Sequence, residues 1–208
     1  MTTTETQTTT DKSDRDLVPG TPEVNQFRPA GIAKDDAADL VDALSARLVG
    51  LLDLGLTLKH IHWNLVGPGF MAVHRLLDEQ VEGVRAMADA VAERIATLGG
   101  IPNGLPGHIT RERDWDDYDL GRAVVAAHLG ALDKVYDGVI GDHRSAVDVV
   151  GKTDPVTEDL LVGQLGELEL YQWFVRAHIE NTSGALMSGD AETELDAAAA
   201  AATGDPLA

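Results

Sequence analysis

The chain has no cysteine, few aromatic residues and no long apolar run. Without cysteine there is neither a disulfide framework nor a thiolate metal site, which fits a cytoplasmic protein. Aromatic residues make up only 4 % of the 208 residues, so a core must be built mainly from aliphatic side chains. No apolar stretch approaches the roughly 20 residues that a membrane-spanning helix needs, and the acidic N-terminus does not resemble a signal peptide. These absences predict a cytoplasmic protein without a membrane partner.

Basic residues are also scarce, since 16 Lys and Arg stand against 35 Asp and Glu, for a formal net charge of −19. A body this acidic repels DNA and anionic membranes and attracts cations. Both ends of the chain are also net acidic. Residues 1–34 contain four basic and five acidic residues, and residues 184–208 contain five acidic residues and no basic one. DNA affinity depends on neutralising phosphates, so binding of DNA by either end is doubtful.

Apolar residues recur at helical spacing in four segments, and no strand signal or internal repeat is present. Glycine pairs end the first two segments, and Asp154-Pro155 provides a cap and a first-turn proline for the fourth. Four helices of about 30 residues would form a bundle about 45 Å long. The four segments with this apolar spacing cover residues 35–65, 70–98, 125–147 and 154–179.

The second and third of these helices are joined by a long connection, residues 101–118, which predicts one short helix near Pro106–Arg113. The sequence therefore predicts one bundle domain over residues 35–183. A flexible N-terminal arm, residues 1–34, would precede it, and a flexible C-terminal tail, residues 184–208, would follow. The alanine run 197–202 in that tail favours either a helix or disorder.

Imidazoles and carboxylates with metal-ligand spacing lie on the first two helices. His74 and Asp78 are four residues apart, as are Asp89 and Glu93, so each pair shares one helical face. The eleven residues from Asp78 to Asp89 are three turns, which puts all four on one stripe. Together with His62 on the first helix, this set without a thiolate suits iron, manganese or zinc.

One helix cannot bring this stripe to a single metal centre. Asp78 and Asp89 are about 16 Å apart along the axis, from a rise of about 1.5 Å per residue, whereas metal–oxygen bonds are about 2 Å long. The stripe also lies beside the apolar face, so the site should flank the core. Two antiparallel copies across a two-fold axis would place His74 and Asp78 of one opposite Asp89 and Glu93 of the other. The last two helices carry no Glu-x-x-His motif, which argues against a conventional ferritin site inside the bundle.

The stretch of residues 59–100 contains a specific pattern. H-W-N-x-x-G-x-x-F-x-x-V-H-x-x-x-D begins at His62, and D-x-x-x-E follows eleven residues after its end. This pattern resembles the Dps family of mini-ferritins, and the likeness extends over roughly residues 35–183. The resemblance implies an all-α, ferritin-like four-helix bundle, with a short extra helix between its second and third helices, that assembles as a hollow dodecamer.

The resemblance also implies an iron-sequestering ferroxidase. Fe(II) would be oxidised by hydrogen peroxide at inter-subunit centres, and ferric mineral would be stored in the cage, which protects the cell and its DNA. Motif match assigns ligation of a di-iron centre, which zinc or manganese could also occupy, to His62, His74, Asp78, Asp89 and Glu93. Trp63 beside the site would donate electrons, and Lys59 would pair with a site carboxylate. Acidic pores that guide Fe(II) would lie near Asp148, Asp154 and Asp159.

Plainer interpretations exist for each feature. His62 alone could be a hydrogen-bonded core histidine, and Asp89 with Glu93 could be a solvated face, although the register of all five residues favours ligation. The three candidate pore residues could instead serve capping and solubility, and both interpretations stay open. For the whole protein the alternatives are a nucleoid-binding, DNA-compacting protein with incidental metal affinity, and a structural bundle without chemistry. The structural bundle does not account for the ligand register.

Overall fold

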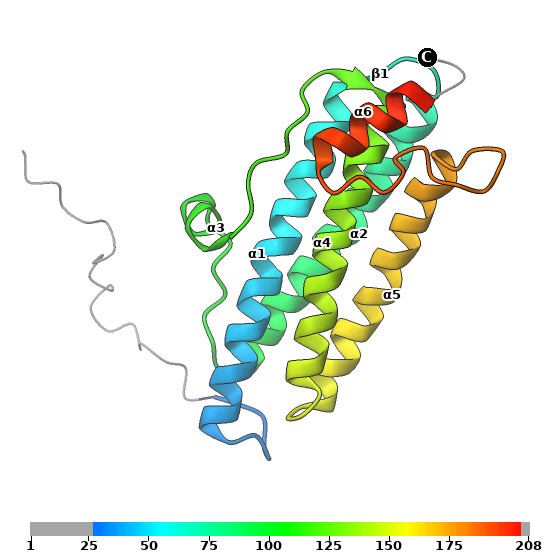
Figure 1. Ribbon diagram of the computed structural model, residues 1–208. Helices are drawn as coiled ribbons and strands as arrows, with labels where there is room; N and C mark the ends of the chain where they lie inside the picture. The colour runs from blue at the N-terminus through cyan, green and yellow to red at the C-terminus, as the bar shows by residue number, and fades with distance from the viewer. Residues whose placement is uncertain (1–26, 205–208) are drawn as a thin grey trace, which may run out of the picture.

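The computed structural model describes residues 27–204, most of which are helical. Four long helices lie side by side and form the four-helix bundle that the sequence predicts (Figure 1). None of the helices in the described range is both long and apolar enough to cross a membrane. The long helices are α1 Lys34–Asn64, α2 Phe70–Thr97, α4 Val125–Val150 and α5 Pro155–His178.

The ends of the helices follow from local chemistry. Gly99, at φ 92°, ends α2 because its N–H donates to the Ala96 carbonyl while the Gly100 N–H donates to that of Ile95 at 2.9 Å. This pattern closes a helix through a left-handed residue that glycine adopts without strain. Asp154 starts α5 by accepting hydrogen bonds from the next two free backbone N–H groups, as its position before Pro155 predicts.

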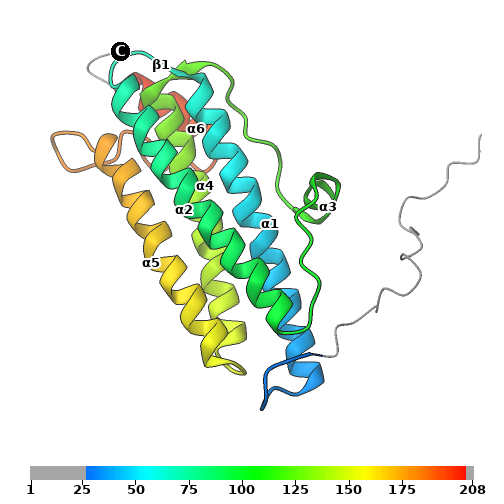
Figure 2. The same ribbon diagram turned by 180° about the vertical axis from the view of Figure 1, so that it is seen from behind.

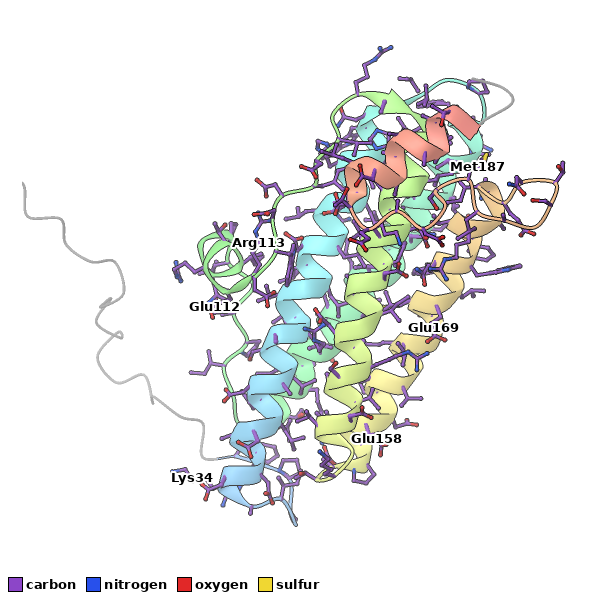
Figure 3. All side chains as sticks on the ribbon, viewed as in Figure 1. Lys34, Glu112, Arg113, Glu158, Glu169 and Met187 are labelled. Carbon is purple, nitrogen blue, oxygen red and sulfur yellow. The ribbon has the colours of Figure 1, made fainter. Side chains whose placement is uncertain are left out.

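The connection from α2 to α4 runs the length of the bundle along α1 and contains the expected short helix, α3 Pro106–Glu112 (Figures 1 and 2). Arg113, just after α3, fixes the connection to α1 by donating to Asp53 Oδ1 at 3.0 Å (Figure 3). The connection ends in β2 Ala123–Val124, which pairs in parallel with β1 Leu65–Val66. The sequence predicts no strand, because two residues are too few to show an alternating pattern.

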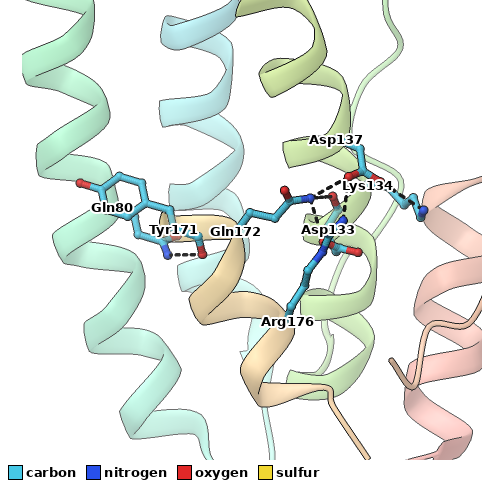
Figure 4. Close-up of polar contacts among 7 residues, drawn as sticks. All are labelled: Gln80, Asp133, Lys134, Asp137, Tyr171, Gln172 and Arg176. Atoms are coloured by element: carbon cyan, nitrogen blue, oxygen red, sulfur yellow. Dashed lines mark hydrogen bonds and ion pairs between the residues drawn. The ribbon is translucent and has the colours of Figure 1, made fainter. Parts of the chain in front are cut away.

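The core is aliphatic, as the low aromatic content predicts. Tyr136 and Tyr171 are its buried aromatic members, and the Tyr136 hydroxyl donates to Gln80 Oε1 at 2.9 Å. A buried polar seam joins α4 to α5, where Asp133 accepts from Gln172 Nε2 at 2.9 Å and from Arg176 Nε at 2.6 Å (Figure 4). Fully buried aliphatic residues include Leu44, Leu51, Leu58, Leu77, Val84, Val91, Ile95, Leu132, Leu161 and Leu168.

The C-terminal segment differs from the flexible tail predicted for residues 184–208. Residues 194–204 form a helix, α6 Glu194–Gly204, which packs across α4 near the end of the bundle that holds β1 (Figure 1). Alanine has the highest helix propensity, and its small side chain allows close packing; Ala197 and Ala201 are fully buried. The predicted N-terminal arm lies outside the described residues up to residue 26.

Candidate metal centre

A tight turn brings the end of α1 onto the start of α2. Gly67 and Gly69 both have positive φ angles, of 93° and 76°, which the reversal of the chain requires. His62 lies in the last turn of α1, and His74 lies on the second turn of α2. The sequence therefore places the two imidazoles together although they belong to different helices.

The two histidines hold each other in place. Their rings stack with centroids 3.6 Å apart and an interplanar angle of 23°. His62 Nδ1 lies 3.0 Å from the His74 carbonyl oxygen, and His74 Nδ1 lies 3.1 Å from the His62 carbonyl oxygen. A carbonyl only accepts, so both Nδ1 atoms carry hydrogen, and in a neutral ring this leaves the lone pair on Nε2. Such bonds orient the imidazoles of metal sites.

Asp78 completes a cluster of three potential ligands. One ligand atom each from His62, His74 and Asp78 lies within 4.8 Å of the others. Lys59 Nζ donates to Asp78 Oδ1 at 2.9 Å and thereby lowers the pKa of that carboxyl. Burial lowers the pKa of His62. The cluster thus combines an ionised carboxylate with a neutral imidazole, the protonation states that bind metal.

The residues around this cluster are aromatic and differ in exposure. Trp63 is 71 % exposed, and the Lys59 ammonium lies 5.8 Å from the centroid of its ring. Phe70 packs against His74, with ring centroids 5.0 Å apart. Sequence reasoning assigned Phe70 no role at the site. Its position four residues before His74, on the same face of α2, was the signal that the two rings would meet.

Asp89 and Glu93 do not join the cluster within one chain. Both are exposed and lie further along α2, on the side that carries Asp78. Within residues 27–204, His62, His74 and Asp78 are the one group of three or more metal-binding side chains with suitable spacing. The structure therefore brings together three of the five candidate ligands and leaves the other two free to face a different molecule.

The three candidate pore residues have different environments. Asp154 is 4 % exposed and receives hydrogen bonds from Arg94 and from the start of α5. Its carboxylate caps α5 and pairs with Arg94, which agrees with the capping interpretation rather than with a role in an iron pore. Asp148 and Asp159, by contrast, are exposed near the junction of α4 and α5, and for these two the pore role stays a prediction.

Known proteins are similar to this chain in sequence and in fold. The Ferritin-like domain family matches residues 41–185. The "DNA protection during starvation protein" of Mycolicibacterium smegmatis is 50 % identical over 175 residues, which are 84 % of this chain and 96 % of that protein. The "Fine tangled pili major subunit" of Haemophilus ducreyi is 50 % identical over 145 residues, 70 % of this chain and 77 % of that protein.

Solved structures give the same result. "Mycobacterium smegmatis Dps" superposes with a TM-score of 0.79 at 51 % identity and covers 80 % of this chain and 95 % of its own. "DpsA14 from Streptomyces coelicolor" superposes with a TM-score of 0.76 at 57 % identity, covering 78 % and 96 %. Similarity at this level over nearly the whole bundle leads to one conclusion: the chain belongs to the Dps family of ferritin-like proteins.

Proposed function

We propose that this protein is a ferroxidase that oxidises Fe(II) with hydrogen peroxide and stores the ferric product inside a hollow dodecamer in the cytoplasm. The observation that carries the proposal is the half-built centre at the α1–α2 turn. His62, His74 and Asp78 lie together, and backbone carbonyls orient both imidazoles, yet these residues form one side only. Membership in the Dps family supports iron sequestration and DNA protection as the general role.

A second copy of the chain would complete the centre. Asp89 and Glu93 are exposed on α2, about three and four turns away from Asp78. When two α2 helices run antiparallel across a two-fold axis, the carboxylates of each chain face the imidazoles of the other. Each pair of subunits would then hold two equivalent iron sites, each made of three ligands from one chain and two from the partner.

The ligand set suits the oxidation of iron as a substrate. Anionic carboxylates favour Fe(III) over Fe(II), and the few protein ligands leave coordination positions for peroxide. Two Fe(II) ions give one electron each to hydrogen peroxide, which takes up two protons and leaves as two water molecules. Fe(II) and peroxide are removed together, so neither remains to form hydroxyl radicals. The same ligands would also accept zinc or manganese.

Residues near the centre would support this chemistry. Trp63 is exposed beside the ligands and would supply an electron to an incompletely reduced oxidant. Lys59 holds Asp78 ionised until iron binds. Asp148 and Asp159 would raise the local concentration of Fe(II) at an entry pore near the α4–α5 junction through their field.

The direct test is peroxide-driven oxidation of Fe(II). We expect the His62→Ala/His74→Ala variant to lose at least about 100-fold in rate, because both nitrogen ligands of the half-site are removed. His178→Ala is the matched control, since His178 is exposed at the end of α5 and contacts the Phe174 carbonyl oxygen at 2.7 Å. Equal rates for wild type and the double variant would disprove the proposal.

The name of the Mycolicibacterium relative, "DNA protection during starvation protein", favours a second candidate function, direct compaction of DNA. The acidic ends of this chain oppose it. We expect no gel shift of duplex DNA at about 50 mM salt, where phosphate contacts are strongest. A tight complex that dissociates steeply as salt is added would instead establish this function.

A further inference from the structure

We infer that the C-terminal helix α6 is a positioning element for the metal centre: it clamps residues 118–124 of the connection onto the end of α1 that carries His62. The consequence for metal binding rests on the function proposed above. The physical coupling itself rests on contacts that link α6 to α4, then to the connection, and finally to α1.

The first link is the contact between α6 and α4. A Cβ atom built on Gly130 of α4 would lie 2.5 Å from the Ala197 carbonyl oxygen and 2.8 Å from the Ala201 Cβ. The backbones of the two helices therefore meet at a point that only glycine permits. Both alanines are fully buried. This close approach fixes the position at which α6 packs on α4.

The second link joins α6 to the connection. Leu120 is buried in a small apolar cluster with Ala127 and Ala131 of α4 and Ala198 of α6. At the start of α6, Glu194 Oε2 accepts a hydrogen bond from the Asp119 backbone N–H at 3.3 Å. The connection is thus held between α6 and the bundle by an apolar contact on one residue and a polar contact on its neighbour.

The third link joins the connection to α1 on both sides of His62. His60 Nε2 donates to the Leu120 carbonyl oxygen at 2.7 Å, two residues before the ligand. Three residues after it, Leu65 pairs with Ala123 in the β1–β2 ladder. His62 itself lies in the last helical turn of α1, where isolated helices fray. The clamped connection therefore fixes a segment that α1 alone would leave loose.

A metal centre is sensitive to this kind of support, because ligands must be held within about 0.5 Å of their working positions. Loss of the clamp should leave the bundle core intact, since the main core cluster contains no residue of α6. We therefore expect a defect in metal affinity without global unfolding.

The test compares Gly130→Ala with Gly138→Ala on the same helix, where an added Cβ meets nothing within 4 Å. In Gly130→Ala we expect faster hydrogen exchange in residues 194–204 and 58–66, and about 10-fold weaker binding of Co(II), measured by calorimetry as a probe for Fe(II). Gly138→Ala should match wild type in both. A chain ending at Asp190, which lacks α6, should reproduce the Gly130→Ala result.

The outcomes separate this inference from the proposed function. If α6 is released or removed but exchange at 58–66 and Co(II) affinity stay at wild-type values, the clamp is disproved. If wild type binds no Co(II), the proposed metal function fails, while exchange at 58–66 still decides whether α6 supports the end of α1. Unchanged exchange throughout Gly130→Ala together with unchanged behaviour of the shortened chain would also overturn the inference.

Discussion

Two inactive variants, mixed and assembled together, should regain about one quarter of the wild-type rate of Fe(II) oxidation. One variant is His62→Ala/His74→Ala, and the other is Asp89→Ala/Glu93→Ala. Each should be inactive alone, because the structure gathers the histidines with Asp78 and leaves the two distant carboxylates on another part of α2. Recovery on mixing is the expected signature of a centre built by two chains.

The expected fraction follows from symmetry. Random pairing makes about half of the dimers mixed, and in a mixed dimer one centre combines both damaged sides while the other combines both intact sides. Half of the sites in half of the dimers are therefore complete. The rate of peroxide-driven oxidation is measured after the subunits are dissociated and reassembled, and native mass must show that the mixed cages have the mass of the wild-type assembly.

A mixture of same-side variants is the control. His62→Ala/His74→Ala mixed with Asp78→Ala damages the same half of the centre in both chains, so no pairing rebuilds a complete site. This mixture should stay inactive. If the two mixtures recover equally, or if the first recovers nothing despite correct assembly, the centre is not shared between subunits.

The ligand stripe was predictable from the sequence because helical spacing alone fixes which residues share a face. His74 and Asp78 are one turn apart, and Asp89 is three turns further on. The orientation of the imidazoles was not predictable, since each Nδ1 bonds to a backbone carbonyl across the α1–α2 turn. Those bonds depend on the exact path of the Gly67–Gly69 turn, and no periodic pattern encodes that path.

Contacts between residues far apart in sequence account for the other differences. The alanine run of α6 has no amphipathic pattern. The position where α6 packs depends on Gly130, which is more than sixty residues earlier in the chain. The role of Asp154 as a helix cap was predictable, because capping depends only on residues next to each other in the sequence. Its second role, as the partner of Arg94 on α2, became visible only when folding brought the two helices together.

Asp154→Ala should lower the free energy of unfolding by about 3–5 kcal/mol at neutral pH. The substitution removes the cap of α5, where Asp154 accepts from the backbone N–H groups of Val156 at 3.3 Å and Thr157 at 3.2 Å. It also leaves the Arg94 guanidinium, whose side chain is 15 % exposed, without its carboxylate. A buried charge without a partner is costly, and chemical denaturation of the two proteins measures the loss.

The effect should depend on pH with a definite sign. Burial alone would raise the pKa of Asp154, but the hydrogen bonds from Thr157 and Arg94 outweigh it and hold the pKa below its ordinary value of 3.8. The stabilisation is therefore complete above pH 3.8 and disappears as the pH falls below it. Asp148→Asn and Asp159→Asn are the controls: both residues are exposed, so they should slow Fe(II) uptake and leave stability unchanged. An Asp154→Ala variant as stable as wild type would show that this carboxylate does not anchor the start of α5 to Arg94 of α2.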